Sequence, residues 1–390
     1  MTDQHADGID SDSEDLPAKA DAGESIDSGK GRIFPCDECG ADLKFAIDTQ
    51  SLKCPFCGAV KTIDTSDLKE VVEQDFHAML ERLKSQQLDE HPDDQLSADE
   101  HAIRCSSCGA EVVFQGTLTS SQCPYCASPL QRDKIHDAPT RVAVDGVLPF
   151  QIAEADAAVR LRDWVRSLWW APNAFLRQGA NGKFNGVYLP YYTFDSLTDT
   201  TYTGQRGDHY YVTGGSGKDA RRERRTRWSY RSGEFERFFD DVLIVAASDQ
   251  SQPLIVGLEP WPLEKCMPFN QQVLAGFFAR TYDITLDQGF GHARARMENE
   301  LTGDIRRRIG GDEQSITSRQ TTYHDVTFKH LLLPVWLLAY RYQDKPYRVV
   351  INAVTGEVSG ERPYSVYKIA AAVLFGVAVA VGIYLLAQAK

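Results

Sequence analysis

The chain has 390 residues, a length that favours two or three domains. Hydrophobic residues make up 42% and charged residues 25%, so collagen-like, wholly disordered and polytopic membrane proteins are excluded. The formal net charge of −13 argues against a nucleic-acid binder that relies on a general positive field.

The negative charge is concentrated in two segments near the N-terminus. Residues 1–30 contain nine acidic and two basic residues, and residues 88–100 contain six acidic residues and no basic one. Both are poor in apolar residues, so we expect an acidic disordered tail at 1–30 and a helix with an acidic linker at 65–100. Docking of an acidic segment on a partner is the alternative.

The C-terminal part is strongly apolar, whereas the N-terminal part has neither the basic region nor the apolar core of a secretion signal. Residues 369–387 are 19 residues without a charge. As a helix they span about 28 Å, close to the hydrocarbon thickness of a bilayer. We predict a transmembrane helix at 369–387, with a buried core helix as the alternative. Arg362 and Lys368 predict a single-pass, tail-anchored protein of the cell membrane with cytoplasmic N-terminal domains.

The cysteines give the most specific pattern. Eight of the nine form two sets with the spacing C-x2-C-x14-C-x2-C, and the second set follows the first by 69 residues: Cys36, Cys39, Cys54 and Cys57, then Cys105, Cys108, Cys123 and Cys126. The two segments align without gaps and are identical at nine of 23 positions. One structural element is therefore duplicated.

This spacing is typical of zinc ribbons. Two cysteines separated by two residues can turn both sulfurs toward one ion, and a following glycine (Gly40, Gly58 or Gly109) takes the positive φ that ends the turn. Two such pairs form a closed four-thiolate site. We predict two structural zinc ions per chain, in ribbons at 31–64 and 101–132. Disulfides and redox pairs are the alternatives, disfavoured because a cytosolic domain is kept reduced and because the quartets match.

The charge of the ribbons favours a protein contact. Residues 31–60 have a net charge of −1 and residues 101–130 a net charge of zero, so neither offers several phosphate contacts. Nucleic-acid binding by the ribbons remains the second interpretation. Cys266 has no partner cysteine nearby and is interpreted as a core residue.

Residues 138–365 form a larger region, for which we predict an α+β domain with a mixed antiparallel sheet. Apolar stripes predict helices at 68–83, 157–168 and 293–305, and strand-rich stretches predict a turn at Ser232-Gly233 and a hairpin around Thr355-Gly356. A helix, a strand that begins with Leu-Pro, and a hairpin occur in this order twice, which suggests an internal duplication.

The sequence contains no recognisable catalytic motif. The segment 212–220 approaches a phosphate loop, but Val212 stands where the first glycine belongs and Asp219 where Ser or Thr is required. We therefore interpret it as a glycine-rich hairpin loop and expect a protein that is not an enzyme. The arginine runs at 221–227 and 306–308 fit a solvated surface, anionic lipid or nucleic acid.

Several fragments together resemble a bacterial family of zinc-ribbon membrane proteins: CPFCG, CPYC, GVYLPYYTFD, FDDVLIVAAS, TFKHLLLPVWLLAYRY and VTGEVSGERPYS. That family is often labelled "primosomal protein N′ (replication factor Y), superfamily II helicase". A helicase of that class needs a phosphate loop and an Asp-Glu box, and this sequence has neither. The resemblance instead implies a membrane-anchored scaffold associated with SPFH-domain and phage-shock-type proteins of membrane stress.

Two leading hypotheses follow, and a hydrolase with an unrecognised site is a third. The first is a non-enzymatic, tail-anchored membrane adaptor whose zinc ribbons present a protein-binding surface to a partner of the SPFH or phage-shock type. The alternative is a nucleic-acid-binding, replication-associated protein. Ala372, Gly376 and Ala380 lie on one face of the transmembrane segment, so we also expect a homo-oligomer or a helix pair through this face. Small residues without such a role are the competing interpretation.

Overall fold

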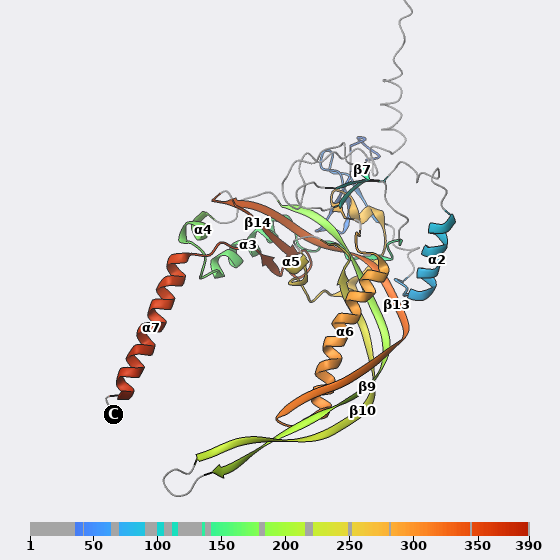
Figure 1. Ribbon diagram of the computed structural model, residues 1–390. Helices are drawn as coiled ribbons and strands as arrows, with labels where there is room; N and C mark the ends of the chain where they lie inside the picture. Colours follow the sequence, from blue (N-terminus) through green and yellow to red (C-terminus); the bar gives the residue numbers. More distant parts are fainter. Residues whose placement is uncertain are drawn as a thin grey trace, which may run out of the picture.

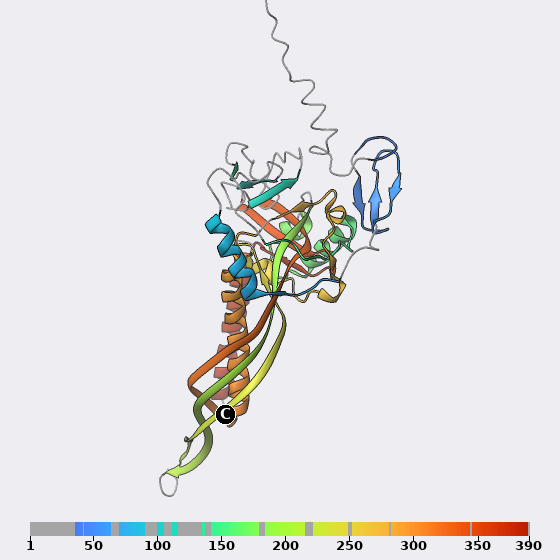
Figure 2. The ribbon, with the colours of Figure 1, turned by 90° about the vertical axis from the view of Figure 1, so that its right-hand side faces the viewer.

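The computed structural model shows a mixed helix and sheet protein with a long curved projection (Figures 1 and 2). It describes residues 36–41, 43–63, 70–89, 100–104, 111–115, 135–136, 142–178, 184–214, 221–248, 252–280, 282–343 and 345–388. The described helices are α2 (Phe76–Asp89), α3 (Glu154–Ser167), α4 (Asn173–Gln178), α5 (Gln252–Val256), α6 (Leu286–Ile309) and α7 (Val366–Gln388), with 3-10 turns η2 (Leu263–Lys265) and η3 (Gln271–Leu274). The predicted combination of helices and antiparallel sheet is confirmed.

The described strands form two sheets. The small sheet contains β1 (Lys44–Ala46), β2 (Ser51–Lys53) and β3 (Val60–Lys61). The large sheet has 12 strands: β4 (Gln74–Asp75), β5 (Glu100–Arg104), β6 (Glu111–Gln115), β7 (Ile135–His136), β8 (Gly146–Val147), β9 (Asn185–Gly214), β10 (Arg221–Val245), β11 (Met267–Pro268), β12 (Phe278–Ala279), β13 (Glu313–Tyr342), β14 (Lys345–Asn352) and β15 (Val358–Gly360). Among these described strands, the pairs β12–β9 and β13–β8 are parallel and the other pairs are antiparallel.

Three strands extend far beyond the domain. β9 and β13 have 30 residues each, which corresponds to roughly 100 Å at about 3.3 Å per residue. We call the projecting part the arm and define it as residues 193–214, 221–243 and 313–329 (Figure 1). β10 and β13 flank β9 in the arm, and β13 begins opposite Gly207, so the outermost part is a two-stranded ribbon of β9 and β10.

The arm bends where both outer strands carry a β-bulge. The register of β10 shifts at Asp241 and that of β13 at Asp325, and both aspartates have a positive φ, of 48° and 47°. Side chains of the central strand β9 form a hydrogen bond to each bulge. The Asp195 carboxylate accepts a hydrogen bond from the backbone N–H of Asp241, and the Ser196 hydroxyl donates one to the carbonyl of His324. Bulges increase local twist and bend a strand, so this level sets the curvature of the arm.

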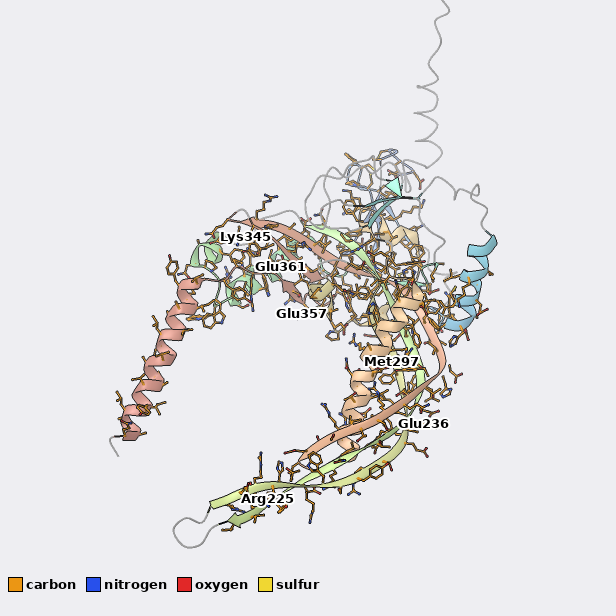
Figure 3. All side chains as sticks on the ribbon, in the orientation of Figure 1. Arg225, Glu236, Met297, Lys345, Glu357 and Glu361 are labelled. Carbon is orange, nitrogen blue, oxygen red and sulfur yellow. The ribbon has the colours of Figure 1, made fainter. Side chains whose placement is uncertain are left out.

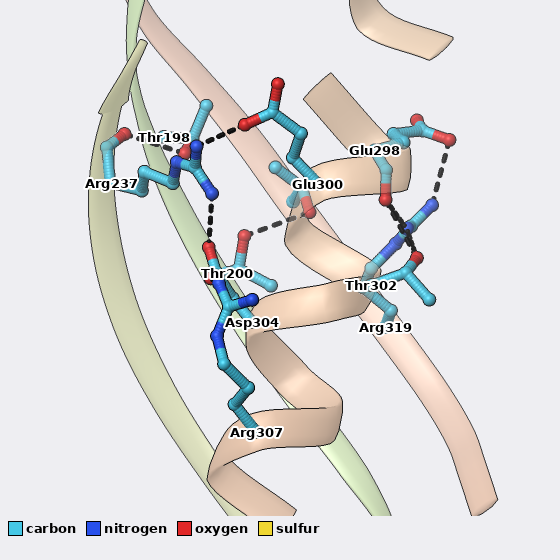
Figure 4. Close-up of polar contacts among 10 residues, drawn as sticks. Thr198, Thr200, Arg237, Glu298, Glu300, Thr302, Asp304, Arg307 and Arg319 are labelled. Atoms are coloured by element: carbon cyan, nitrogen blue, oxygen red, sulfur yellow. Dashed lines mark hydrogen bonds and ion pairs between the residues drawn. The ribbon is translucent and has the colours of Figure 1, made fainter. Parts of the chain in front are cut away.

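α6 lies on the concave side of the arm and holds both outer strands (Figures 1 and 4). Arg237 of β10 forms ion pairs with Glu300 and with Asp304, and Arg319 of β13 bonds to Glu298 at 2.8 Å. The helix is capped by Thr285 and followed by Gly310, and its buried stripe includes the predicted residues Ala293, Met297, Leu301 and Ile305.

The two Leu-Pro segments are neighbours in one sheet. Leu189 of β9 lies opposite Leu333 of β13, so Pro190 pairs with Leu332 and Pro334 with Tyr188. The two segments thus run antiparallel, and the pair Leu189–Leu333 is the centre of an approximate twofold arrangement. Such a centre is compatible with the predicted duplication, which stays a prediction.

Two details of the sequence interpretation are wrong. Ser232 and Gly233 do not form a turn, because they lie inside β10 and pair with Thr203 and Tyr202. The small residues are held in the ladder by a neighbouring strand that continues past them. The helix expected at 68–83 begins only at Phe76, since β4 before it pairs with β13.

Candidate metal centre

The first cysteine set folds as two similar turns joined by the β1–β2 hairpin. In the first turn, the backbone N–H of Gly40 bonds to the carbonyl of Cys36 at 2.8 Å, and in the second the N–H of Gly58 bonds to Cys54 at 3.1 Å. Both glycines have a positive φ, of 69° and 78°, a conformation that strains residues with a Cβ. The structural role predicted for these two glycines is confirmed.

The hairpin brings the four sulfurs together. The Sγ atoms of Cys36, Cys39, Cys54 and Cys57 all lie within 4.8 Å of one another. Two of the separations, Cys36 to Cys57 and Cys39 to Cys54, are 3.5 Å. A disulfide would require about 2.05 Å, whereas a tetrahedral zinc site with Zn–S bonds of about 2.3 Å places its sulfurs about 3.8 Å apart. The group is therefore arranged as a metal site, with zinc the ion that this ligand set fits best.

The electrostatics of the four thiols also favour a bound cation. Backbone N–H groups of Cys57 and Phe56 lower the pKa of the Cys54 thiol to about 6, although its burial opposes the change. For Cys57, the N–H of Ala59 lowers the pKa, but hydrogen bonds with the sulfurs of Cys39 and Cys54 raise it to about 12. One thiolate thus suppresses the ionisation of its neighbour, and a cation bound between the two sulfurs would offset this repulsion.

One side of this ribbon packs on the rest of the protein. The backbone N–H of Phe45 donates to the carbonyl of Ala275 at 2.9 Å, and the Gln50 side chain donates to the carbonyl of Phe150 at 2.9 Å. Phe45 and Leu52 are buried in the same apolar cluster as Phe150. The ribbon is therefore anchored on the rest of the protein, and Figure 2 shows its small sheet, β1 to β3, beside the large sheet.

Other apolar side chains of the ribbon face water. Phe56, between the cysteines of the second turn, is 80% exposed, and Val60 is 58% exposed. The sequence interpretation missed Phe56, although the two middle residues of a metal-binding turn point away from the ion whenever both flanking cysteines bind it. Phe56 and Val60 thus give the ribbon an apolar surface at the second cysteine turn.

The second cysteine set, Cys105, Cys108, Cys123 and Cys126, lies outside the described residues, as does Gly109. Around it the structure describes β5, β6 and β7, of which β6 pairs with β12 and joins the large sheet. The second zinc site stays a prediction.

Cys266 is partly buried beside an open cavity of about 780 Å³ that Trp261, Asp241 and Lys329 also line. Burial raises the pKa of the Cys266 thiol to about 12, so this thiol is protonated at neutral pH. Lys329 bonds to Asp241 at 2.8 Å and to Glu73 at 3.2 Å, so its charge is neutralised locally. The partial burial and the raised pKa of Cys266 agree with a packing role for this residue.

α7 is the one helix among the described residues that is long and apolar enough to cross a membrane. It covers Val366–Gln388 and includes the whole predicted segment 369–387, and an 18-residue window within it has a mean hydropathy of 2.6. None of its side chains is buried by the rest of the protein, in contrast to a core helix.

The arginine runs both lie on or beside the arm. Arg222, Arg224, Arg225 and Arg227 are exposed near its end, where Figure 3 labels Arg225, and Arg308 stacks over Phe235 at the end of α6. Residues 215–220, which include most of the loop that approaches a phosphate-binding motif, connect the paired ends of β9 and β10 and lie outside the described residues.

Comparisons with known proteins attach no activity to this architecture. No protein-family model matches the chain, and no solved structure matches it. The chain is similar to uncharacterized protein YdjG of Bacillus subtilis (strain 168), with 25% identity over 351 residues. The matched region covers 87% of this chain and 92% of that protein, so the similarity spans most of both.

Proposed function

We propose that the protein is a non-enzymatic membrane adaptor that displays metal-held protein-binding surfaces at the cytoplasmic face of the cell membrane. The observation that carries the proposal is the presence, in one chain, of a closed four-thiolate site with an exposed apolar rim and of an apolar helix that the protein itself leaves uncovered.

The ligand set supports a structural metal. Four cysteines saturate a tetrahedral zinc ion and leave no position for a substrate or a reactive water. The ion then fixes the turn that contains Phe56. The free energy of metal binding offsets the cost of exposing this apolar side chain to water. A rigid aromatic residue is a typical anchor of protein interfaces. We extend the same role to the second ribbon, with Cys105, Cys108, Cys123 and Cys126 as ligands of a second zinc ion.

The partner is expected at the membrane. By resemblance to the family described above, it is an SPFH-domain or phage-shock-type protein, and the process is a response to membrane stress. α7 would keep the adaptor at the bilayer, and Arg362 and Lys368, which precede the charge-free run at 369–387, favour a cytoplasmic domain.

A comparison of exposed positions tests the proposal. The full chain is purified from detergent-solubilised membranes, and co-purifying proteins are identified by mass spectrometry for the wild type, for Phe56→Ser and for Val256→Ser. Val256 is 49% exposed on α5 and serves as the control. We expect an SPFH-domain or phage-shock-type protein with the wild type and with the control, and its loss with Phe56→Ser. Equal recovery with all three proteins would contradict a Phe56 contact.

A second function, nucleic-acid binding, is favoured by one observation. Near the end of the arm, Arg222 lies over the Tyr211 ring at 4.1 Å, and exposed Trp228 and Tyr230 follow on the same strand. Arginines next to exposed aromatic rings suit single-stranded nucleic acid. Binding that weakens steeply with salt and is lost in Arg222→Ala/Arg224→Ala would support this function.

A further inference from the structure

The loop between α3 and α4 exposes two adjacent tryptophans. Trp169 is 74% exposed and Trp170 is 41% exposed, whereas Leu168 and Ala171 on either side are 4% and 1% exposed. The two buried neighbours hold the loop on the domain, so the indoles cannot fold back into the core. Such a pair in water is costly unless another apolar phase covers it.

Hydrogen bonds fasten this loop to the start of α7. The backbone N–H of Ser365 donates to the carbonyl of Trp170 at 2.8 Å. The ammonium group of Lys368 donates to the carbonyls of Trp169 and Ala171 at 3.0 Å and 2.9 Å, and lies 5.9 Å from the centre of the Trp169 ring. Residues 199 positions apart in the sequence are thereby held at one place.

The position of Lys368 sets the depth of the loop in a bilayer. Lys368 is the last charged residue before the charge-free run that begins at Ile369, so the boundary between headgroups and hydrocarbon lies beside it. The carbonyls of Trp169 and Ala171, which accept its hydrogen bonds, lie at the same depth. Tyr364 and Tyr367, which are 56% and 89% exposed, flank the same boundary.

We propose that Trp169, Trp170, Tyr364 and Tyr367 form an aromatic collar that inserts into the headgroup layer of the bilayer crossed by α7. Indole and phenol side chains favour this layer because their rings are apolar and their N–H and O–H groups bond to water and headgroups. The collar rests on the membrane anchoring in the proposed function. It adds a second attachment to the helix and thereby fixes which side of the domain faces the membrane.

Fluorescence quenching tests the collar on the full chain. The protein is reconstituted in vesicles of phosphatidylcholine and phosphatidylglycerol, with and without bromine on the acyl chains near the headgroups, and vesicle flotation reports its attachment. We expect bromine to quench the wild-type tryptophan emission and most of this quenching to be lost in Trp169→Phe/Trp170→Phe. Trp228→Phe, at a 44% exposed position on the arm, should be quenched as strongly as the wild type.

The outcomes separate the collar from the anchor. Wild-type protein that fails to float with the vesicles contradicts the anchoring itself. Protein that floats, but whose quenching is the same in Trp169→Phe/Trp170→Phe as in the wild type, contradicts the collar alone and leaves the tryptophans to a protein partner. Since both indoles are exposed, phenylalanine leaves the packing intact, and the single variants Trp169→Phe and Trp170→Phe give independent readings.

Discussion

Cys54 shows how strongly single residues control the ribbon. Its thiol has the lowered pKa in the set and lies in the interior of the ribbon, 1% exposed. We predict that reduced wild-type protein contains two zinc ions per chain and that Cys54→Ser contains one. The loss should also unfold the first ribbon, because binding free energy on the order of 10 kcal/mol is coupled to folding in such sites. Elemental analysis measures the metal content.

Cys266→Ser is the matched control for this substitution, since it removes a thiol outside both sets. It should retain two zinc ions per chain. A wild-type content of one ion would contradict the second ribbon, and a content of none would contradict both.

Asp195, at the bend of the arm, should make stability depend on pH. Burial raises the pKa of its carboxyl group from 3.8 to about 7; the backbone N–H of Asp241 opposes this rise, the Glu73 carboxylate adds to it, and Lys329 opposes it. Between these two values the folded state binds more protons than the unfolded state. The free energy of unfolding therefore falls as the pH rises through this window.

Replacing this carboxyl group should remove the effect. In Asp195→Asn, the amide oxygen can still accept the hydrogen bond from the backbone N–H of Asp241, but the side chain has no charge. Above about pH 7 this variant should therefore be more stable than the wild type, by on the order of 1 kcal/mol. Thermal unfolding in detergent, compared on both sides of the window, measures the difference. Asp240→Asn, at an exposed position beside the same bulge, should behave as the wild type, and an unchanged pH dependence in Asp195→Asn would be evidence against this assignment.

At the scale of single elements, α6 contains two glycines with opposite surroundings. A Cβ at Gly289 would lie 2.8 Å from the ring of Tyr192, which is fully buried, whereas a Cβ at Gly291 would meet nothing within 4 Å. We predict that Gly289→Ala destabilises the protein by about 1–3 kcal/mol through overpacking. Gly291→Ala should stabilise it by up to about 1 kcal/mol through helix propensity. A shift of the unfolding temperature in the same direction for both variants would contradict the packing of α6 on β9 at Tyr192.

α7 offers a similar matched pair for helix association. Gly376 lies on the face of Ala372 and Ala380, while Gly382 lies on a different face, and neither contacts another part of the chain. Isoleucine is favourable in hydrocarbon, so Gly376→Ile and Gly382→Ile should both remain inserted. Only Gly376→Ile should weaken crosslinking between copies in membranes, because it blocks close backbone approach. Equal crosslinking of the two variants would reduce the helix to a plain anchor.

Local chemistry could be predicted from the sequence, and long-range contacts could not. The grouping of the four cysteines between Cys36 and Cys57 and the buried stripe of α6 follow from residue spacing over short stretches of chain, and both are observed. The length of β10, 25 residues, escaped prediction because Ser232 and Gly233 resemble a turn, and only pairing with the neighbouring strand β9 keeps them extended. The contact of Trp169 with Lys368 depends on the packing of the whole domain, which no local pattern encodes.

At the scale of the whole molecule, the directions of the arm and of α7 have a consequence for membrane binding. Both extend on the same side of the domain (Figure 1). A bilayer perpendicular to α7 would meet the arm, whose outer part carries exposed arginines, and each charge in hydrocarbon costs about 2.5–3.5 kcal/mol. We therefore expect the apolar run of α7 to turn relative to the arm in a bilayer, at a point after Lys368, so that the bonds of Lys368 to the tryptophan loop are kept. The bond from Ser365 to Trp170 precedes this point and keeps the junction beside the tryptophan loop.

The position of the arm can be tested by cysteine labelling in membranes. Tyr230 is 67% exposed on the arm, and Leu374 is 70% exposed on α7 within the apolar run. In inside-out vesicles, a membrane-impermeant maleimide should react with Tyr230→Cys without detergent, because a polar arm stays in the cytoplasmic water. Leu374→Cys should react only after detergent and denaturant are added, and mass spectrometry distinguishes both positions from the native cysteines. Labelling of Tyr230→Cys only after detergent would mean that the arm enters the bilayer, and its labelling in intact cells would reverse the topology.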